Sequence, residues 1–328
     1  MLKGTIFNQN PEAESEIIEN FIYDKKASPS DYFGTSRDKN IVVILTESFE
    51  WFSFITDSEK YPNGINLSDE TWEYLFPNLT KIYNESVKCT EFHSREKTDI
   101  AEILSIVGSY PTGSYVNYDF ESNAFPQSVP SIYSELNSDA AVRYFHNGIG
   151  YFYNRENVMP SLGFDDFYDC VAMYNLDNPM PDHTAVGERN LDSEMFESCK
   201  DLMFPADERF CTYIATITMH GTYSERNNLK KWRDKLSSVY TPSDDESAQQ
   251  LFYYTAAAME FDHAIGIMLN DLKAKNILDD TTIIIYGDHN TYYHNLSNYV
   301  KDIEKYDTER NFPDLYRVPL MIYDTDIA

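Results

Sequence analysis

Two segments of the chain place metal-binding side chains after runs of β-branched residues. Glu47 comes two residues after the run 41–45, and Asp288 and His289 follow the run 281–286 across a glycine. In sheets covered by helices, ligands gather at the carboxyl ends of the strands. Carboxylates offer hard anionic oxygens and histidine a neutral nitrogen, which together suit a divalent cation. The pattern predicts a metal site, and the alternative is a pair of ordinary polar loops.

Thr98 is a further candidate, at the start of a stretch with helical apolar spacing. Ile100, Ile103, Leu104 and Val107 follow it at this spacing. One interpretation makes Thr98 a helix N-cap, because its hydroxyl can accept a bond from a free backbone N–H. The other makes it a nucleophile at a positive helix end that favours phosphate. A single ion could join these groups only if they converge to within about 6 Å.

Buried strands and amphipathic helices must hold these residues. Continuous β-branched runs such as 41–45 are typical of strands buried on both faces. Further strands are predicted at 141–145, 212–218 and 318–323, and helices at 71–85, 98–107, 128–137, 190–202 and 251–275. Strands that alternate with helices predict an α/β sandwich with a largely parallel central sheet flanked by helices.

The first 38 residues are predicted to be a lead-in segment, and residues 39–328 the folded domain. Pro11 with the acids behind it predicts a short helix, because Pro suits the first turn and acids its positive end. Residues 28–40, rich in Pro, Gly, Ser and Asp, then break the pattern. Residues 237–250 are predicted to be an exposed connection.

Composition excludes several classes of protein. The 328 residues carry 26 Lys and Arg against 54 Asp and Glu, a net charge of −28, with 42% hydrophobic and 15% aromatic residues. A disordered acidic tail would be poor in apolar and aromatic residues. Binding to nucleic acid, or to an anionic membrane through a basic patch, requires clustered cations. The sequence therefore predicts a folded protein with neither kind of partner surface.

Neither a membrane span nor a signal peptide is expected in this sequence. The longest apolar runs, 41–45 and 283–286, fall far short of the roughly 20 residues that cross a bilayer. The N-terminus lacks the apolar core of a signal peptide. The four cysteines have no CxxC spacing, which argues against structural zinc. We expect four buried thiols, with one disulfide among Cys170, Cys199 and Cys211 as the alternative.

Five short motifs occur in a fixed order. They are LTES (45–48), EKTD (96–99), FHN with YNRE (145–147 and 153–156), TMHG (218–221) and YGDH (286–289). Together with the longer stretches 40–52, 76–87, 144–169 and 271–289, they resemble the lipoteichoic acid synthase family. This family lies in the sulfatase-like branch of the alkaline phosphatase superfamily. The resemblance covers residues 40–323 and implies a sulfatase-like three-layer sandwich.

The resemblance implies a metal site and a nucleophile. Glu47, Asp288 and His289 would be metal ligands, and Thr98 both the nucleophile and the fourth ligand. One divalent ion would be bound, with manganese favoured and magnesium or zinc as alternatives. Sulfatase chemistry itself is not expected, because residues 97–101 lack the Cys/Ser-x-Pro-x-Arg motif that it requires.

The resemblance also implies substrate contacts. His146, Tyr153, Arg155 and His220 would contact the phosphoglycerol group, and His220 would also be catalytic. Taken alone, His220 could be a structural histidine and Arg155 a surface ion pair of little energetic weight. His93, His183 and His263 match no motif and are interpreted as structural, and Trp51, Trp72 and Trp232 as packing residues.

The implied activity is that of a metal-dependent phosphoglycerol transferase acting through a covalent phospho-threonine. Its partners would be a phospholipid headgroup donor and a polyol or glycolipid acceptor, with no nucleic acid. It would work at the extracellular face of a bacterial cytoplasmic membrane, associated with it through segments outside this chain. The alternatives are a phosphodiesterase or phosphoethanolamine transferase on the same fold, or a non-catalytic binding domain.

The sequence departs from the family pattern in three places. Tyr153 stands where the family commonly has Trp. Residues 290–294 replace a Gly followed by Ser and leave His294 as an unassigned candidate. The chain reaches Ala328 soon after the predicted strand 318–323, whereas the family normally continues into a small C-terminal subdomain, which we expect this chain to lack.

Overall fold

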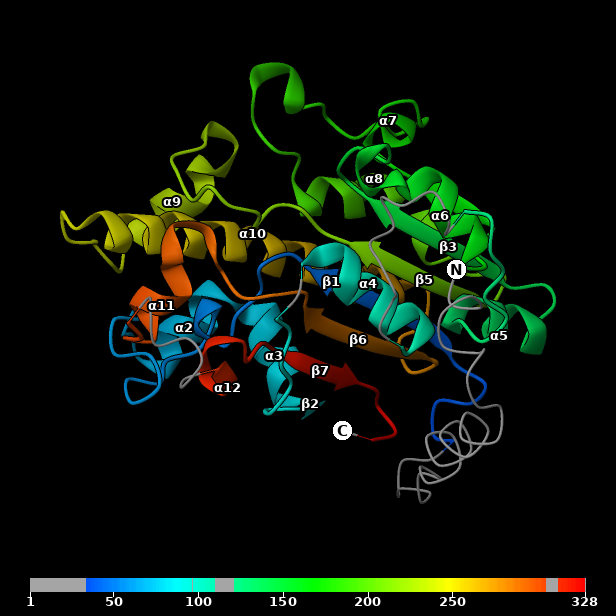
Figure 1. Ribbon diagram of the computed structural model, residues 1–328, viewed down its shortest axis with the longest axis horizontal. Coiled ribbons are helices and arrows are strands. Elements are labelled where there is room, and N and C mark those ends of the chain that lie inside the picture. The colour runs from blue at the N-terminus through cyan, green and yellow to red at the C-terminus, as the bar shows by residue number, and fades with distance from the viewer. Residues whose placement is uncertain (1–33, 96, 110–120, 305–311, 328) are drawn as a thin grey trace, which may run out of the picture. The chain divides into compact units, whose positions relative to one another are not determined.

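A computed structural model describes residues 34–95, 97–109, 121–304 and 312–327 (Figure 1). Contacts divide the chain into two compact units, Met1–Arg37 and Asp38–Ala328. All helices and strands named below belong to the second unit. The helix predicted after Pro11 lies outside the described residues. The roles predicted for the lead-in segment and the catalytic domain stay predictions.

A seven-stranded sheet forms the centre of the second unit, in the order β2-β7-β6-β1-β5-β3-β4. The strands β6, β1, β5, β3 and β4 are parallel, and β7 is antiparallel to both β6 and β2. The bounds are β1 Asn40–Thr46, β2 Ser86–Lys88, β3 Ala141–His146, β4 Asp166–Tyr168, β5 Phe210–Ala215, β6 Thr281–Gly287 and β7 Leu320–Tyr323. The predicted α/β class with a largely parallel sheet is confirmed.

Helices connect the strands and cover both faces of the sheet. They are α2 Asp69–Leu75, α3 Pro77–Asn84, α4 Thr98–Val107, α5 Val129–Leu136, α6 Arg155–Ser161, α7 Cys170–Met173, α8 Asp192–Met203, α9 Lys230–Ser237, α10 Glu246–Ala274, α11 Leu296–Val300 and α12 Phe312–Leu315. Single 3₁₀ turns are η2 Trp51–Ser53, η3 Phe152–Asn154, η4 Thr184–Val186, η5 Asn227–Leu229 and η6 Tyr293–Asn295. Figure 1 shows the long helix α10 lying alongside the strands.

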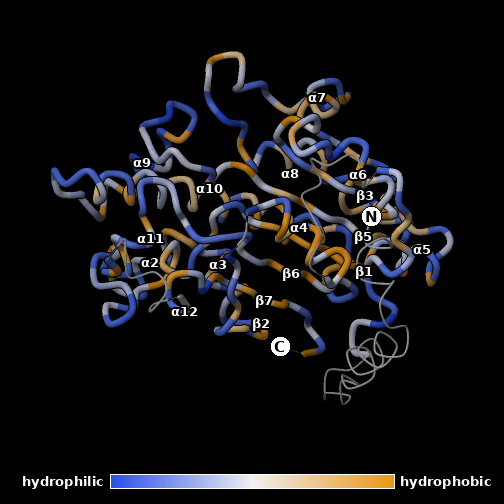
Figure 2. Tube along the Cα trace, viewed as in Figure 1, coloured by the Kyte–Doolittle hydropathy of each residue, from blue (hydrophilic) through white to orange (hydrophobic). Residues whose placement is uncertain are grey.

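Alternate residues of each strand enter two different cores, as the side-chain period of two requires. Val42 and Ile44 pack in the core that includes α8 and α10. Val43 and Leu45 pack in the core that includes α4 and α6. In Figure 2 the strands β6 and β7 carry the orange of apolar residues. A sheet buried on both faces explains why its strands read as continuous apolar runs.

Several predicted boundaries are wrong for local reasons. The helix predicted at 71–85 is two helices, because Pro77 cannot continue a helix that ends at Leu75. Strand β5 ends at Ala215, and the backbone N–H groups of Ile217 and Thr218 donate instead to Asp192 Oδ1. Helix α10 begins five residues early, because Asp245 caps it, so the connection predicted at 237–250 shortens to 238–245.

The cysteines and tryptophans are mostly buried side chains. All four cysteines are free, so the predicted alternative of a disulfide is wrong, and Cys89 is only partly buried. The three tryptophans are buried, as expected of packing residues. None of the helices in the described ranges combines the length and hydropathy that crossing a bilayer requires.

Candidate active site

The register of two parallel strands brings the acidic candidates together. Thr46 at the end of β1 pairs with Gly287 at the end of β6. Glu47 and Asp288 therefore leave the sheet at the same level, with exposed fractions of 3% and 0%. The Ser48 backbone N–H donates to Asp288 Oδ1 at 2.8 Å, which ties the two strand ends to each other. One ligand atom each from Glu47, Asp288 and His289 lies within 4.8 Å of the others.

His289 presents one ring nitrogen to this cluster. Its Nδ1 lies 2.9 Å from the Asn290 carbonyl oxygen, which can only accept, so Nδ1 carries the hydrogen and Nε2 a lone pair. Nε2 lies 3.4 Å from Glu47 Oε1 and 3.3 Å from Asp288 Oδ2. Burial alone would lower the pKa of His289, but the Asp288 and Glu47 carboxylates outweigh burial and raise it.

The two carboxylates are poorly compensated by protein groups. Burial first, and then the Glu47 charge, raise the pKa of Asp288 to about 7. Asp288 Oδ2 is buried and has no hydrogen-bond partner within the described part of the chain. Burying like charges without a counter-ion is costly, so a cation at this point would stabilise both. Two carboxylate oxygens, an imidazole nitrogen and a hydroxyl fit a divalent cation such as manganese, magnesium or zinc.

Thr98 occupies the first turn of α4 and faces the same cluster. Its Oγ1 lies 3.5 Å from Glu47 Oε2 and 3.4 Å from His289 Nε2. The N-cap of α4 is Lys97, whose side chain makes no capping bond, so the interpretation of Thr98 as the N-cap is wrong. The Thr98 hydroxyl is instead the atom that the positive end of α4 presents to the cluster.

Arg155 lies at the start of α6 and is almost fully buried, with 2% exposed. Its Nε donates to both Glu102 oxygens at 3.2 and 3.1 Å, and Glu102 is 0% exposed. Arg155 and Glu102 therefore form a buried ion pair, and the interpretation of Arg155 as part of a surface ion pair is wrong. Its guanidinium carbon lies 5.1 Å from the centre of the Tyr153 ring, so the aromatic residue at this position contacts the arginine.

His146 at the end of β3 completes this arrangement. Its Nδ1 lies 3.0 Å from the Ala215 carbonyl oxygen, and its Nε2 lies 3.4 Å from Arg155 Nη1. Because a carbonyl oxygen accepts and a guanidinium donates, His146 is neutral, with its hydrogen on Nδ1. Burial first, and then the Arg155 charge, lower the pKa of His146 to about 3. Both ring nitrogens therefore hold protein partners.

His220 is joined to the metal-ligand cluster by a row of aromatic rings. The centre of the His289 ring lies 4.8 Å from that of Tyr292, Tyr292 stacks on Tyr293 at 4.7 Å, and Tyr293 lies 5.2 Å from His220. These two tyrosines belong to the segment 290–294 that departs from the family pattern. His294 from the same segment is exposed.

Arg189 reaches this row from the loop before α8. Its Nη2 lies 3.1 Å from His220 Nδ1 and donates to the Gly221 carbonyl oxygen. His220 Nδ1 also lies 2.6 Å from the Gly221 carbonyl oxygen, and its Nε2 lies 3.5 Å from the Tyr293 hydroxyl. Reasoning from the sequence missed both Arg189 and Glu102. Glu102 carried a usable sign, a charge between the apolar positions 101 and 103 of a helix, whereas Arg189 carried none.

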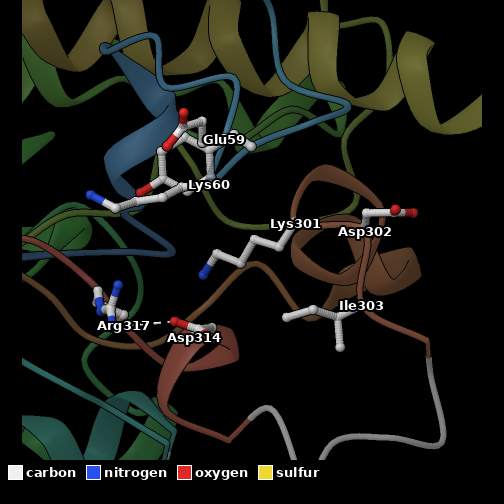
Figure 3. A pocket seen from close by; sticks show the side chains of 8 residues that line it. Glu59, Lys60, Lys301, Asp302, Ile303, Asp314 and Arg317 are labelled. Carbon is white, nitrogen blue, oxygen red and sulfur yellow. Dashed lines mark ion pairs between the residues drawn. The ribbon is translucent and has the colours of Figure 1, made fainter.

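A pocket of about 300 Å³ lies elsewhere in the same unit (Figure 3). Lys60, Lys301 and Arg317 line it together with Glu59, Asp302 and Asp314. Lys301 also donates to Glu50 Oε2 at 2.9 Å, and Glu50 comes three residues after Glu47. The pocket is thus linked to the loop that carries a metal-ligand candidate.

Comparisons with known proteins identify the family of this chain. A family model described as Sulfatase matches residues 39–328. Lipoteichoic acid synthase 1 of Bacillus subtilis strain 168 is 27% identical over 316 residues, which cover 93% of this chain and 45% of the relative. The lipoteichoic acid synthase of Staphylococcus saprophyticus is 26% identical over 295 residues, 87% of this chain and 41% of the relative. The chain thus spans less than half the length of the curated relatives it matches.

Solved structures share the fold. The lipoteichoic acid synthase LtaP of Listeria monocytogenes has a TM-score of 0.64 at 22% identity, covering 94% of this chain and 71% of that chain. The phosphoglycerol transferase GacH of Streptococcus pyogenes, in complex with sn-glycerol-1-phosphate, has a TM-score of 0.59 at 16% identity, covering 95% and 73%. At these identities the likeness concerns the fold alone.

Proposed function

Because this chain belongs to the sulfatase family, we propose that it is a metal-dependent phosphoglycerol transferase that works through a covalent phospho-threonine. The observation that carries the proposal is the meeting of the Thr98 hydroxyl with three buried ligand side chains at a helix N-terminus. Similarity to two lipoteichoic acid synthases supports the choice of a phospholipid headgroup as donor and a polyol or glycolipid as acceptor. The proposed place of work is the extracellular face of a bacterial cytoplasmic membrane.

Glu47, Asp288, His289 and Thr98 would hold one divalent cation, for which manganese is our first choice. When bound, such an ion offsets the buried carboxylates, makes the threonine alkoxide accessible and draws charge from phosphoryl oxygens. The remaining chemistry belongs to the side chains of this chain.

In the first half-reaction, Thr98 Oγ attacks the phosphorus of the donor. A bond forms between Oγ and phosphorus, and the bond from phosphorus to the lipid oxygen breaks. His220 is proposed to supply the proton that the leaving lipid alcohol gains. Thr98 gives its hydroxyl proton to solvent water in the same half-reaction, so the number of protons is conserved. Arg155, held by Glu102 and His146, and the Tyr153 ring beside it would position the phosphoglycerol group.

In the second half-reaction, the acceptor hydroxyl attacks the same phosphorus. The bond from phosphorus to Thr98 Oγ breaks, and Oγ regains a proton while the acceptor loses one. If water takes the place of the acceptor, the same steps give a phosphodiesterase. The nature of the acceptor therefore decides between transfer and hydrolysis.

The test is to incubate the protein with phospholipid labelled in a glycerol phosphate headgroup, with and without manganese. Wild type should gain the mass of one glycerol phosphate on Thr98 and pass it to glycerol or a glycolipid. Thr98→Ala should form no adduct and lose at least about a thousandfold in rate, since removing a nucleophile abolishes the covalent route. Thr98→Ser, which keeps a hydroxyl, is the matched control.

Each alternative gives its own result in this assay. Release of free glycerol phosphate without transfer indicates a phosphodiesterase, and adduct formation from an ethanolamine headgroup only indicates a phosphoethanolamine transferase. Binding without turnover indicates a non-catalytic domain. Unchanged headgroup release by Thr98→Ala would show that Thr98 is not the nucleophile.

A further inference from the structure

The two arginines beside the site differ in how their charge is compensated. Arg155 and Glu102 are both buried and lie within 3.1 Å, so their charges largely cancel. Arg189 forms no ion pair with any carboxylate of the described residues, and its guanidinium contacts His220 Nδ1 and the Gly221 carbonyl oxygen.

The backbone at Arg189 is fixed by hydrogen bonds from neighbouring side chains. The Arg189 carbonyl oxygen accepts from Arg226 Nη2 at 3.1 Å and from Asn228 Nδ2 at 2.8 Å. The following side chain, Asn190, donates to the Asn147 carbonyl oxygen at 2.8 Å. A guanidinium on a backbone fixed in this way loses little freedom when it binds a ligand.

The side chain of Arg189 is half-buried and lies within electrostatic reach of the metal-ligand cluster. Burial lowers the pKa of Arg189, and the Glu47 carboxylate works in the opposite direction. The guanidinium stays charged in either case. Partial removal from water strengthens its attraction for an anion, because the local dielectric constant is lower than in bulk water.

We propose that Arg189 is a substrate-binding residue that holds the anionic oxygens of a phosphate ester beside His220. Guanidinium groups suit this task, because their N–H fork matches the spacing of phosphate oxygens. Arg155 and the Tyr153 ring beside it then position the phosphoglycerol group, while Arg189 supplies a positive charge that no carboxylate of the described residues pairs with. The inference rests on the proposed function in so far as the ligand is the phosphoglycerol group.

The experiment measures binding of sn-glycerol-1-phosphate and of inorganic phosphate to the manganese-loaded protein by calorimetry. Arg189→Gln should raise both dissociation constants about ten- to hundredfold, as the loss of a charge-assisted bond predicts. Arg189→Lys should lose less affinity for both anions, because lysine keeps the positive charge. The matched control is Arg209→Gln, which removes an exposed arginine at the opposite end of β5 and should change binding less than about twofold.

Manganese affinity and thermal stability distinguish binding from a structural role. Both should stay near the wild-type values in Arg189→Gln, because Arg189 is not a metal ligand. The inference is overturned if Arg189→Gln binds phosphate like wild type, if it loses manganese and phosphate together, or if wild type binds neither anion.

These experiments distinguish a failure of the Arg189 inference from a failure of the proposed function. Binding of phosphate that depends on Arg189, without any transfer of phosphoglycerol, upholds the inference and contradicts the function. Normal transfer by Arg189→Gln with an unchanged KM upholds the function and contradicts the inference.

Discussion

Thr98 Oγ1 lies 3.4 Å from Nε2 of His289, although the two residues are 191 positions apart in the sequence. The contact joins the start of α4 to the end of β6. Neither element could create the cluster alone, because the ligand atoms come from two parallel strands and the hydroxyl from a helix between them in sequence. Predictions about this site therefore concern the elements that hold it as much as the ligands.

Removal of one ligand should abolish stabilisation by metal. Manganese at a hundredfold excess over its Kd should stabilise wild type by about 2.7 kcal/mol, because it binds only the folded protein. Asp288→Asn should show almost none of this effect, since Asp288 Oδ2 is the partnerless buried oxygen of the cluster. Thermal melting with and without manganese measures the difference.

Asp262→Asn is the matched control for this prediction. Asp262 is also a buried aspartate, but it accepts from the backbone N–H groups of Asn78 and Leu79 at the start of α3. It should lower the stability of the protein and leave the manganese effect intact. If manganese stabilises Asp288→Asn as much as it stabilises wild type, Asp288 is not a metal ligand.

Lys301 should support metal binding without touching the metal. Glu50, which is fully buried, accepts from Lys301 Nζ and from the Ser297 hydroxyl, and its Oε1 lies 3.3 Å from the Thr291 backbone nitrogen. It therefore joins the loop after Glu47 to the loop after His289. Lys301→Met should weaken manganese binding about ten- to hundredfold, as the loss of outer-shell partners does elsewhere. Titration with manganese, followed by electron paramagnetic resonance, measures it.

The pocket in Figure 3 supplies the control for Lys301. Lys60 lines the same pocket, but its side chain is 60% exposed against 5% for Lys301, and among the described residues its one ion pair is with Asp57. Lys60→Met should leave manganese affinity unchanged. Equal effects of the two substitutions would mean that the charge of the pocket, rather than the bridge through Glu50, matters.

Much of the metal-ligand cluster could be predicted from the sequence, because its geometry follows from strand order. Continuous apolar runs predicted the strands β1 and β6. Two parallel neighbouring strands bring their carboxyl ends to the same edge of the sheet, independently of the loops that follow them. The register that aligns Thr46 with Gly287 could not be predicted, because both strands are uniformly apolar and permit more than one alignment.

The charged partners Glu102 and Arg189 could not be predicted from the sequence for a different reason. Glu102 meets Arg155 and Tyr144 through contacts between α4, α6 and β3, and nothing in the spacing of these residues encodes that meeting. Arg189 sits in an irregular loop whose path is fixed by Arg226 and Asn228. Such partners depend on tertiary packing, so only the structure could identify them.

Breaking the Arg155–Glu102 pair should cost stability as well as activity. Arg155→Gln leaves Glu102 buried without its principal donor, which should destabilise the protein by about 3–5 kcal/mol. Glu102→Gln should cost less, because its amide oxygen can still accept from Arg155. Urea unfolding measures both, and equal stability of Arg155→Gln and wild type would contradict the buried pair.

The buried acid Glu260 should make stability fall as the pH rises. Its carboxylate accepts from the backbone N–H groups of Asp192 and Ser193 at the start of α8, and it faces the Asp192 carboxylate and the Arg226 guanidinium. Burial first, and then the Asp192 charge, raise the pKa of Glu260 from 4.5 to about 7. The folded state therefore holds this proton more tightly than the unfolded state does.

Since the folded protein binds the extra proton, the free energy of unfolding should decrease from about pH 4.5 to pH 7. Glu260→Gln removes this contribution, so the stability of wild type relative to the variant should decline by up to about 3 kcal/mol between pH 5 and pH 8. Urea unfolding of both proteins at pH 5, 6, 7 and 8 measures the decline. Acids away from Glu260, Asp262 among them, act on both proteins and cancel in the difference, whereas the neighbouring Asp192 titrates together with Glu260 and contributes to it. Parallel stability profiles would show that Glu260 titrates normally, and that the two N–H donors and Arg226 compensate its charge.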